Sequence, residues 1–338
     1  MSLMSTTMPR LSRPFAMRRV HSLFGLWIVL FLIEHMVTNS QAALLIGENG
    51  EGFIRAVNFL KNLPYLHAIE IILLGVPLLY HMIWGAVYLF RAKINSFPTT
   101  KNKPTLTKFG RNHAYSWQRI TSWVLLVGII AHVGYMRFYM YPAEVDTGND
   151  SAFFVRISMD PGLYTVSDRL GVKLYNQQAI NEVKNHIKSH DQELKTLSSE
   201  FEKLQESPSP YVYQKTIDGL MNRYQNLEDQ KAYLTGLEKR KISGNEVIAE
   251  ANNFGTATLL IVRDSFKSVF KSILYTIFVL SAVFHAFNGL WTFIMTWGVI
   301  LKMRTQSRAV NWCITIMVIV GFLGLSSIWG TYYLNLRN

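Results

Sequence analysis

Long apolar runs alternate with polar stretches along the chain. Five of these runs are long enough for a helix to cross a bilayer, which takes about 20 residues. They cover residues 21–45, 66–90, 117–140, 270–300 and 310–334. The pattern predicts an all-α membrane protein built as a bundle of five transmembrane helices. It divides the chain into 1–140 with an N-terminal tail and the first three spans, a polar insertion at 141–269, and 270–338 with the last two spans.

The polar insertion carries a helical repeat of its own. Apolar residues at spacings of three and four form a coiled-coil seam with one polar member: Ile180, Val183, Ile187, His190, Leu194, Leu197, Phe201 and Leu204. A second, poorer heptad follows the Ser207–Pro210 turn signal: Ile217, Leu220, Tyr224, Leu227 and Leu234. The two runs predict an antiparallel helical hairpin outside the membrane, as a spacer or as a partner-binding element. Residues 246–269 are predicted to be an amphipathic helix leading into the fourth span.

The charge distribution indicates the topology. The chain has 34 Lys and Arg against 22 Asp and Glu, a formal net charge of +12. A basic balance suits nucleic acid, an anionic membrane face or loops that set topology. Topology is favoured over nucleic acid, because the basic residues gather just outside the apolar runs: Arg10, Arg13, Arg18, Arg19; Arg91, Lys93, Lys101, Lys103, Lys108, Arg111; Lys302, Arg304, Arg308. The positive-inside bias then puts the N-terminus in the cytoplasm. The C-terminus, the 46–65 loop and the insertion are predicted to lie outside.

Four histidines lie inside four different apolar runs: His35, His81, His132 and His285. An ionisable residue inside a span is costly, so it is a functional hypothesis by default. A single such histidine is equally well explained by an interhelical hydrogen bond. Four of them at two depths favour ligands instead: His35 and His132 both lie about 21 Å along outward-running spans at 1.5 Å per residue. Pairing His81 with His285 leaves an inner and an outer bis-imidazole site.

Glycines recur one helical turn from three of these histidines. Gly85 and Gly289 follow their histidine by four residues, and Gly128 precedes His132 by four. Residues four apart share a helix face, and a porphyrin beside its ligand needs that face free of side chains. Packing of helices through small residues is the alternative for each glycine alone. The pattern predicts two b-type haems, His35 with His132 and His81 with His285, with both axial positions filled and electron transfer as the chemistry.

Two rival types of metal site are disfavoured. A single cysteine, Cys313, excludes a disulfide, a cysteine-ligated iron–sulfur cluster and a CxxCH haem attachment within the chain. Four histidines at two depths, without an intramembrane cysteine or carboxylate cluster, fit a zinc or copper site poorly.

Polar residues near the span ends are further candidates. On the cytoplasmic side, His21, Ser22, Gln118 and Arg119 are candidate hydrogen-bond partners for the propionates of the inner haem. Lipid-headgroup anchoring explains the arginine as well.

Two carboxylates suggest a quinone site. Glu70 near the outer start of the second span, and Glu34 beside His35, are candidates for quinone binding and proton transfer. A polar contact inside the bundle is the alternative for both.

Several segments together resemble the cytochrome b subunits of type B succinate dehydrogenases and fumarate reductases. They are Arg18–Gly25 with Ile33–Asn39, Leu63–Pro64 with Ala68–Ile71, Pro77–His81 with Gly85, Trp117–Thr121 with His132, and Phe284–Trp291 with Trp297–Gly298. The resemblance covers roughly 15–140 and 270–335. It is looser for the insertion, which is similar to what chlamydia-like bacteria carry.

This resemblance implies a five-helix, two-haem anchor in a bacterial cytoplasmic membrane. It implies the same histidine pairing, a flavoprotein and an iron–sulfur subunit as partners on the cytoplasmic face, and menaquinone or another quinone as electron acceptor. Some fumarate-reducing relatives have a proton-conducting Glu two residues before the fourth-span ligand. Here that position is Val283, so that proton path is not expected.

Two alternatives remain open at this point. The first is a di-haem cytochrome b of another quinone-linked respiratory enzyme. The second is a haem-free membrane scaffold that presents the coiled-coil hairpin. The chain has no Gly-rich dinucleotide loop, so flavin and succinate chemistry are expected to belong to a partner subunit.

Overall fold

The computed structural model describes residues 12–43, 48–91, 110–146, 151–188, 190–206 and 213–337. The Ser207–Pro210 turn and five of the basic residues of the topology argument lie outside these ranges: Arg10, Lys93, Lys101, Lys103 and Lys108. The chain forms two compact units. The spanning unit runs to Ser40 and includes Asn62–His132 and Phe270–Ile328; the insertion unit comprises Gln41–Lys61, Val133–Val269 and Trp329–Asn338.

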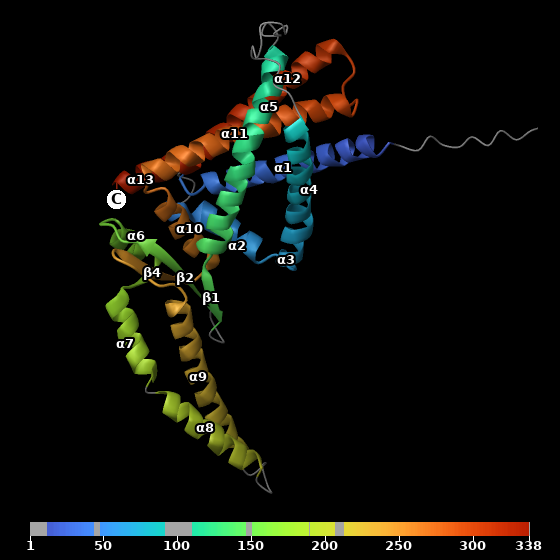
Figure 1. The fold of residues 1–338 in the computed structure, drawn as a ribbon. Helices are drawn as coiled ribbons and strands as arrows, with labels where there is room; N and C mark the ends of the chain where they lie inside the picture. The colour runs from blue at the N-terminus through green and yellow to red at the C-terminus, as the bar shows by residue number, and fades with distance from the viewer. Residues whose placement is uncertain are drawn as a thin grey trace, which may run out of the picture. The chain divides into compact units, whose positions relative to one another are not determined.

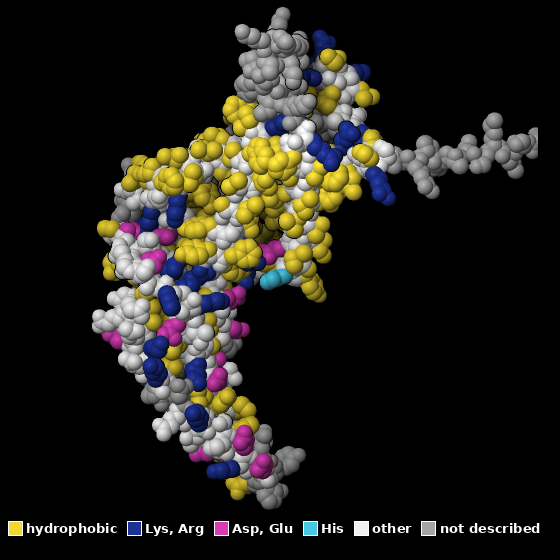
Figure 2. All heavy atoms as spheres, in the orientation of Figure 1, with side chains coloured by type: hydrophobic (Ala, Val, Ile, Leu, Met, Phe, Trp, Pro, Cys, Tyr) yellow, Lys and Arg dark blue, Asp and Glu magenta, His cyan; other side chains and the backbone are white. Residues whose placement is uncertain are grey.

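Five helical segments are long and apolar enough to cross a membrane, as predicted (Figure 1). Their bounds are Arg13–Ser40 (α1); Leu66–Ile69 (α3), Glu70–Gly75 (η2) and Val76–Arg91 (α4); Gly110–Val133 (α5) and Gly134–Tyr139 (η3); Val269–Thr296 (α11); Met303–Leu325 (α12), Ser326–Gly330 (η5) and Thr331–Arg337 (α13). The chain is therefore a mostly helical, multi-pass membrane protein. Hydrophobic side chains cover these helices in Figure 2. Several are largely exposed, which suits contact with lipid: Phe90, Val127, Trp312 and Phe322.

The predicted span boundaries need correction at several ends. The first helix begins at Arg13 instead of residue 21, and the third at Gly110 instead of 117. Long basic side chains extend toward water while their backbone continues the helix, so charge alone does not end it. The fourth helix ends earlier than predicted, at Thr296.

Within the spanning unit, α1 packs against α4 and α12. Gly324 on α12 allows a close approach, since a Cβ atom there would lie 2.6 Å from Val279 Cγ1 and 2.8 Å from Met36 Sδ. Small residues at such crossings are typical of membrane helices, where dispersion contacts drive association.

The second span contains a π-helical turn, η2, directly before α4. Pro77, the second residue of α4, is buried and has no N–H to continue the hydrogen-bond ladder. Two more π-helical turns, η3 and η5, lie near the ends of the third and fifth spans. Turns of this kind are rare and frequently mark functional sites.

The insertion unit contains a four-stranded antiparallel sheet that the sequence analysis did not predict. Its order is β1-β2-β4-β3, with bounds Ala143–Asp146 (β1), Ser151–Ser158 (β2), Lys173–Tyr175 (β3) and Glu246–Ala251 (β4). Helix α10, Phe254–Ser265, packs on β2 and β4, and α2, Glu51–Lys61, packs on α10. The predicted continuous helix over 246–269 is therefore wrong in its first part, which is β4.

Side chains from both faces of the sheet are buried. Phe153, Val155 and Ile157 belong to one apolar cluster together with Leu260 of α10. Phe154, from the opposite face, packs with Ile180 and Leu237 of the helical hairpin. Because both faces are covered, Ala152–Val155 of β2 is an apolar run without alternation, and such a short run is hard to distinguish from part of a helix.

The predicted antiparallel hairpin is present. Its helices are Gln177–Lys188 (α7), His190–Gln205 (α8) and Gln214–Glu238 (α9). Helix α9 packs against both α7 and α8, and Leu194, Leu197 and Leu227 are buried between α8 and α9. The seam therefore follows the predicted heptads over the described residues.

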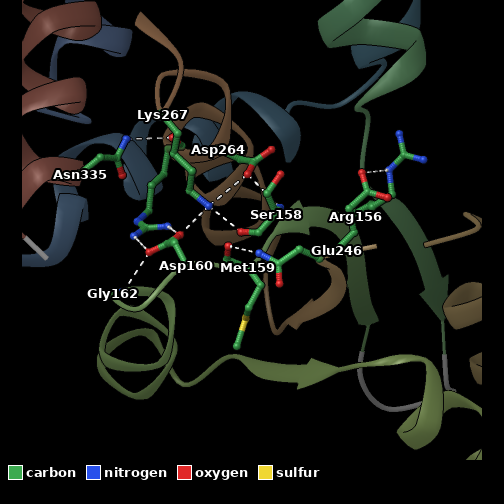
Figure 3. Close-up of polar contacts among 11 residues, drawn as sticks. Arg156, Ser158, Met159, Asp160, Gly162, Glu246, Asp264, Lys267 and Asn335 are labelled. Atoms are coloured by element: carbon green, nitrogen blue, oxygen red, sulfur yellow. Dashed lines mark hydrogen bonds and ion pairs between the residues drawn. The ribbon is translucent and has the colours of Figure 1, made fainter. Parts of the chain in front are cut away.

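A network of charged side chains connects the end of β2 and the loop before α6 (Leu163–Leu170) to the C-terminal end of α10 (Figure 3). Arg263 holds Asp160 with two hydrogen bonds of 2.8 Å, and Lys267 Nζ lies 2.6 Å from Asp160 Oδ2. Lys267 also binds Asp264 Oδ1 at 3.1 Å and the carbonyl of Ser158 at 2.6 Å. The network fixes the last turn of α10, four residues before α11 begins.

Candidate functional site

The structure brings the four intramembrane histidines together as two pairs. The ring centroids of His35 on α1 and His132 on α5 lie 5.9 Å apart, with an interplanar angle of 81°. Those of His81 on α4 and His285 on α11 lie 6.2 Å apart, also at 81°. Each pair therefore joins two different spans, with the partners that depth and resemblance both predict.

The separations suit one metal ion between each pair. A bond from a metal ion to an imidazole nitrogen is about 2.0 Å long. Two such bonds in line, together with the distances from nitrogen to ring centre, place the centroids about 6 Å apart. Among the described residues, no three His, Cys, Asp or Glu side chains gather around one point, so each pair would supply two protein ligands. Two histidines at this separation could hold one haem iron between them.

Each of the four rings makes a polar contact through its Nδ1 atom. His81 Nδ1 lies 3.1 Å from the backbone carbonyl of His21, which accepts hydrogen bonds and therefore requires the proton on Nδ1. His132 Nδ1 lies 3.2 Å from Tyr275 Oη. A metal-bound histidine is usually fixed in this way by a partner on its second nitrogen. Nε2 of His81 is then the nitrogen with a free lone pair.

The other two histidines have longer contacts. His285 Nδ1 lies 3.4 Å from Ser122 Oγ, which itself donates to the carbonyl of Gln118 at 2.6 Å and so has a lone pair facing the ring. His35 Nδ1 lies 3.4 Å from Asn39 Nδ2. At 3.4 Å these contacts orient the rings more weakly than the ordinary hydrogen-bond range of about 2.7–3.2 Å.

The predicted propionate partners lie in different settings. His21 stacks on His81 with ring centroids 4.0 Å apart, and its buried Nδ1 has no hydrogen-bond partner within the described chain. Arg119 donates to the carbonyl of Tyr115 at 3.2 Å, while its buried Nε is also unpaired among the described residues. Both nitrogens fit a cofactor that brings anionic oxygen atoms to this region.

Ser22 and Gln118 are already engaged. Ser22 Oγ accepts a hydrogen bond from Trp297 Nε1 at 3.0 Å. Gln118 donates to the carbonyl of His285 at 3.1 Å and accepts from Asn288 Nδ2 at 2.7 Å. Gln118 thus holds the turn that carries His285, which is a different task from binding a propionate.

The three glycines divide into two kinds. A Cβ atom on Gly85 would meet His21 Cε1 at 3.5 Å, and one on Gly289 would meet Gln118 Nε2 at 3.8 Å, which are ordinary contact distances. A Cβ atom on Gly128 would overlap the ring of Phe278. Close helix packing therefore accounts for Gly128, whereas protein atoms alone do not require glycine at the other two positions.

The two candidate carboxylates also differ. Glu70 is half-buried and is the first residue of the π-helical turn η2. Glu34 is exposed on α1 and accepts a hydrogen bond from Thr38 Oγ1 at 2.8 Å. This contact joins two residues one turn apart on the same helix.

Sequence reasoning missed the polar residues that contact the histidine rings: Tyr275, Ser122 and Asn39. Each is a polar residue in or beside an apolar run, which was the available signal. Which of them faces a histidine depends on helix rotation, and one sequence does not give that rotation.

The chain is similar to one curated protein, the succinate dehydrogenase cytochrome b558 subunit of Bacillus subtilis (strain 168). The two are 35% identical over 123 residues, which are 36% of this chain and 55% of the relative. The chain thus spans about half the length of the curated relative that it matches. No family model and no solved structure matches the chain.

Proposed function

We propose that this chain is the di-haem cytochrome b anchor of a succinate:quinone oxidoreductase, transferring electrons between an iron–sulfur subunit and a membrane quinone. The observation that carries the proposal is the pair of bis-histidine sites, each joining two spans with its rings about 6 Å apart. The similarity to a succinate dehydrogenase cytochrome b558 subunit supports the same class of complex.

Within this proposal, His35 and His132 hold one haem b and His81 and His285 hold the other. A haem with two imidazole ligands exchanges single electrons and leaves no coordination position open for substrate. The carbonyl of His21 and the hydroxyl groups of Tyr275 and Ser122 fix the rings of His81, His132 and His285. His21 Nδ1 and Arg119 Nε, which have no hydrogen-bond partner among the described residues, would donate to the haem propionates.

The quinone site is proposed near Glu70. The carboxylate lies at the start of the second span, where the basic loops predict the outer face of the membrane. A carboxylate at this position would take up and release the protons that accompany quinone reduction and quinol oxidation. A flavoprotein and an iron–sulfur subunit are proposed to bind at the opposite, cytoplasmic face, and menaquinone is the proposed quinone.

The proposal predicts which histidine belongs to which haem. In purified complex, we expect His35→Ala and His132→Ala to remove one reduced b-type band and its redox transition. His81→Ala and His285→Ala should remove the other, because a buried haem that loses one of two protein ligands is poorly held. The measurement is a redox titration followed by absorbance, with His186→Ala on the insertion as the matched control.

Two results would overturn the proposal. The first is wild-type protein without reduced b-type bands after expression with adequate haem supply. The second is a spectrum in which all four substitutions have the same effect, because two independent sites require two groups. Co-purification without a flavoprotein or an iron–sulfur subunit would leave a cytochrome b but assign it to another respiratory enzyme.

A further inference from the structure

The second span has a backbone carbonyl that loses its α-helical donor to a proline. In an α-helix, the N–H of each residue bonds to the carbonyl four residues earlier. Pro77 has no N–H, so the carbonyl of Leu73 loses its helical donor. Upstream of Pro77 the chain takes the π-helical register, in which the N–H of Val76 bonds to the carbonyl of Ile71.

The missing donor comes from another helix. Trp27 on α1 donates its indole N–H to the carbonyl of Leu73. Inside a membrane no water replaces such a bond, so an unpaired carbonyl is costly. Trp27 and Pro77 thus act on the same atom: the proline removes one donor and the tryptophan supplies another.

The register of this turn decides where Glu70 points. Glu70 precedes His81 by 11 positions. At about 100° per residue, an uninterrupted α-helix would bring the two side chains to within about 20° of the same face. The additional residue in a π-helical turn rotates the upstream segment by about 100° relative to that arrangement. The carboxylate is therefore turned away from the helix face that carries His81.

We propose that Trp27 is a positioning residue for the quinone site, because its indole holds the π-helical turn that sets the direction of Glu70. This inference rests on the proposed function for its effect on quinone chemistry. The hydrogen bond and its effect on the span are independent of that function.

A double-mutant cycle separates positioning from simple stabilisation. Trp27→Phe keeps an aromatic ring and removes the donor, so the Leu73 carbonyl is left unpaired. Pro77→Ala restores the N–H that an α-helix would use. In the double variant the carbonyl again has a donor, but from its own helix and in the α register, with Glu70 rotated. Trp312→Phe, at an exposed position on α12, is the matched control for losing an indole.

The cycle is measured on the purified complex by thermal stability and by quinone kinetics. We expect Trp27→Phe to lower the unfolding midpoint by about 3 °C, and the double variant to recover it. Quinone turnover should fall in Trp27→Phe and in the double variant, by up to about 100-fold, as expected for a displaced catalytic group. Its pH dependence should change in the same way as in Glu70→Gln. Turnover with a soluble dye as acceptor should stay unchanged in all of them.

Recovery of both stability and quinone kinetics in the double variant would overturn the inference, since Trp27 would then be only structural. An unchanged midpoint and unchanged kinetics in Trp27→Phe would overturn it too. If Trp27→Phe does not assemble, the double variant alone decides, because it is expected to assemble with normal haem and impaired quinone kinetics. If Glu70→Gln leaves quinone turnover intact, the proposed quinone site fails, while the stability half of the cycle still tests the hydrogen bond.

Discussion

At the scale of single residues, two of the glycines near the histidines differ in whether protein atoms occupy the space next to them. Gly128 abuts the ring of Phe278, so the protein itself explains why no side chain is present. Gly289 has only ordinary contacts, the nearest at 3.8 Å from Gln118 Nε2. Protein contacts therefore do not explain why residue 289 is a glycine. The proposed haem beside His285 explains it, because the haem needs the space that a side chain would fill.

A pair of alanine substitutions tests this distinction. We expect Gly128→Ala to destabilise the helix bundle by about 1–3 kcal/mol, whether or not haem is bound, because it overpacks a filled contact. Gly289→Ala should leave the stability of haem-depleted protein unchanged and reduce occupancy of the inner haem. The measurements are thermal unfolding with and without haem, and haem content per protein. Equal effects of both substitutions on haem-depleted protein would contradict the distinction.

The residues of the site were predictable to different degrees. The four histidines are visible in the sequence because an ionisable residue within an apolar run is rare. Counting residues along helices of predicted direction paired His35 with His132, whereas the depth of His285 rested more on the family resemblance. The groups that orient them, such as Tyr275 and Ser122, were not predictable, since a hydroxyl group in a span equally well bonds to its own backbone.

At the scale of elements, the insertion unit combines its apolar clusters with a network of charged side chains around Asp160. Burial raises the pKa of Asp160, but hydrogen bonds and charge from Arg263 and Lys267 outweigh this and hold the net pKa below its ordinary value. A carboxyl with a lowered pKa in the folded state contributes stability that is present above its unfolded pKa of about 3.9. That stability is lost as the pH falls through the lowered folded value.

We therefore expect the insertion unit to lose stability on acidification below about pH 4. Asp160→Asn should lower its stability at pH 7 by about 2–4 kcal/mol, because Arg263 would remain buried without its carboxylate. It should also flatten the pH dependence in that window. Circular dichroism melts of the whole protein in detergent at pH 7 and pH 3.5 measure both effects. Asp168→Asn, at an exposed position on α6, is the control; an equal response of the two variants would contradict the assignment.

Elements were predictable where one face is polar. The hairpin seam was visible because its outer residues are charged, so the spacing of Leu194 and Leu197 stands out. The sheet was not visible, because β2 is covered on both faces and β1 and β3 are short. Strand β4 was assigned to a helix for the same reason, as its side chains are almost all buried.

At the scale of the whole molecule, the chain passes between the spanning unit and the insertion unit five times, near residues 40, 61, 132, 269 and 328. In a chain that crosses a membrane five times, these positions are alternately C-terminal and N-terminal ends of successive spans. They therefore belong to the same side of the membrane. The basic loops belong to the other side, which the positive-inside rule assigns to the cytoplasm.

This topology predicts accessibility in intact cells. In a Cys313→Ser background, Ser199→Cys on α8 should react with a membrane-impermeant maleimide added to intact cells. Thr305→Cys, at the start of α12, should react only after lysis. Both positions are exposed, so accessibility of the side chain is matched. Labelling of Thr305→Cys and not of Ser199→Cys in intact cells would show the reverse orientation.

The insertion unit is assembled from three separate stretches of chain, with a consequence for biogenesis. Asn335 on α13 donates to the carbonyl of Arg263 at 3.0 Å, and Gly330 lies against Ala43. The ribosome makes residues 329–337, the end of the fifth helical segment, well after the residues of the sheet and hairpin. The insertion unit therefore completes its folding last. Its three stretches of chain meet only if every span is inserted in the correct direction. We expect a chain with one inverted span to lack the contacts of Asn335 with Arg263 and of Gly330 with Ala43.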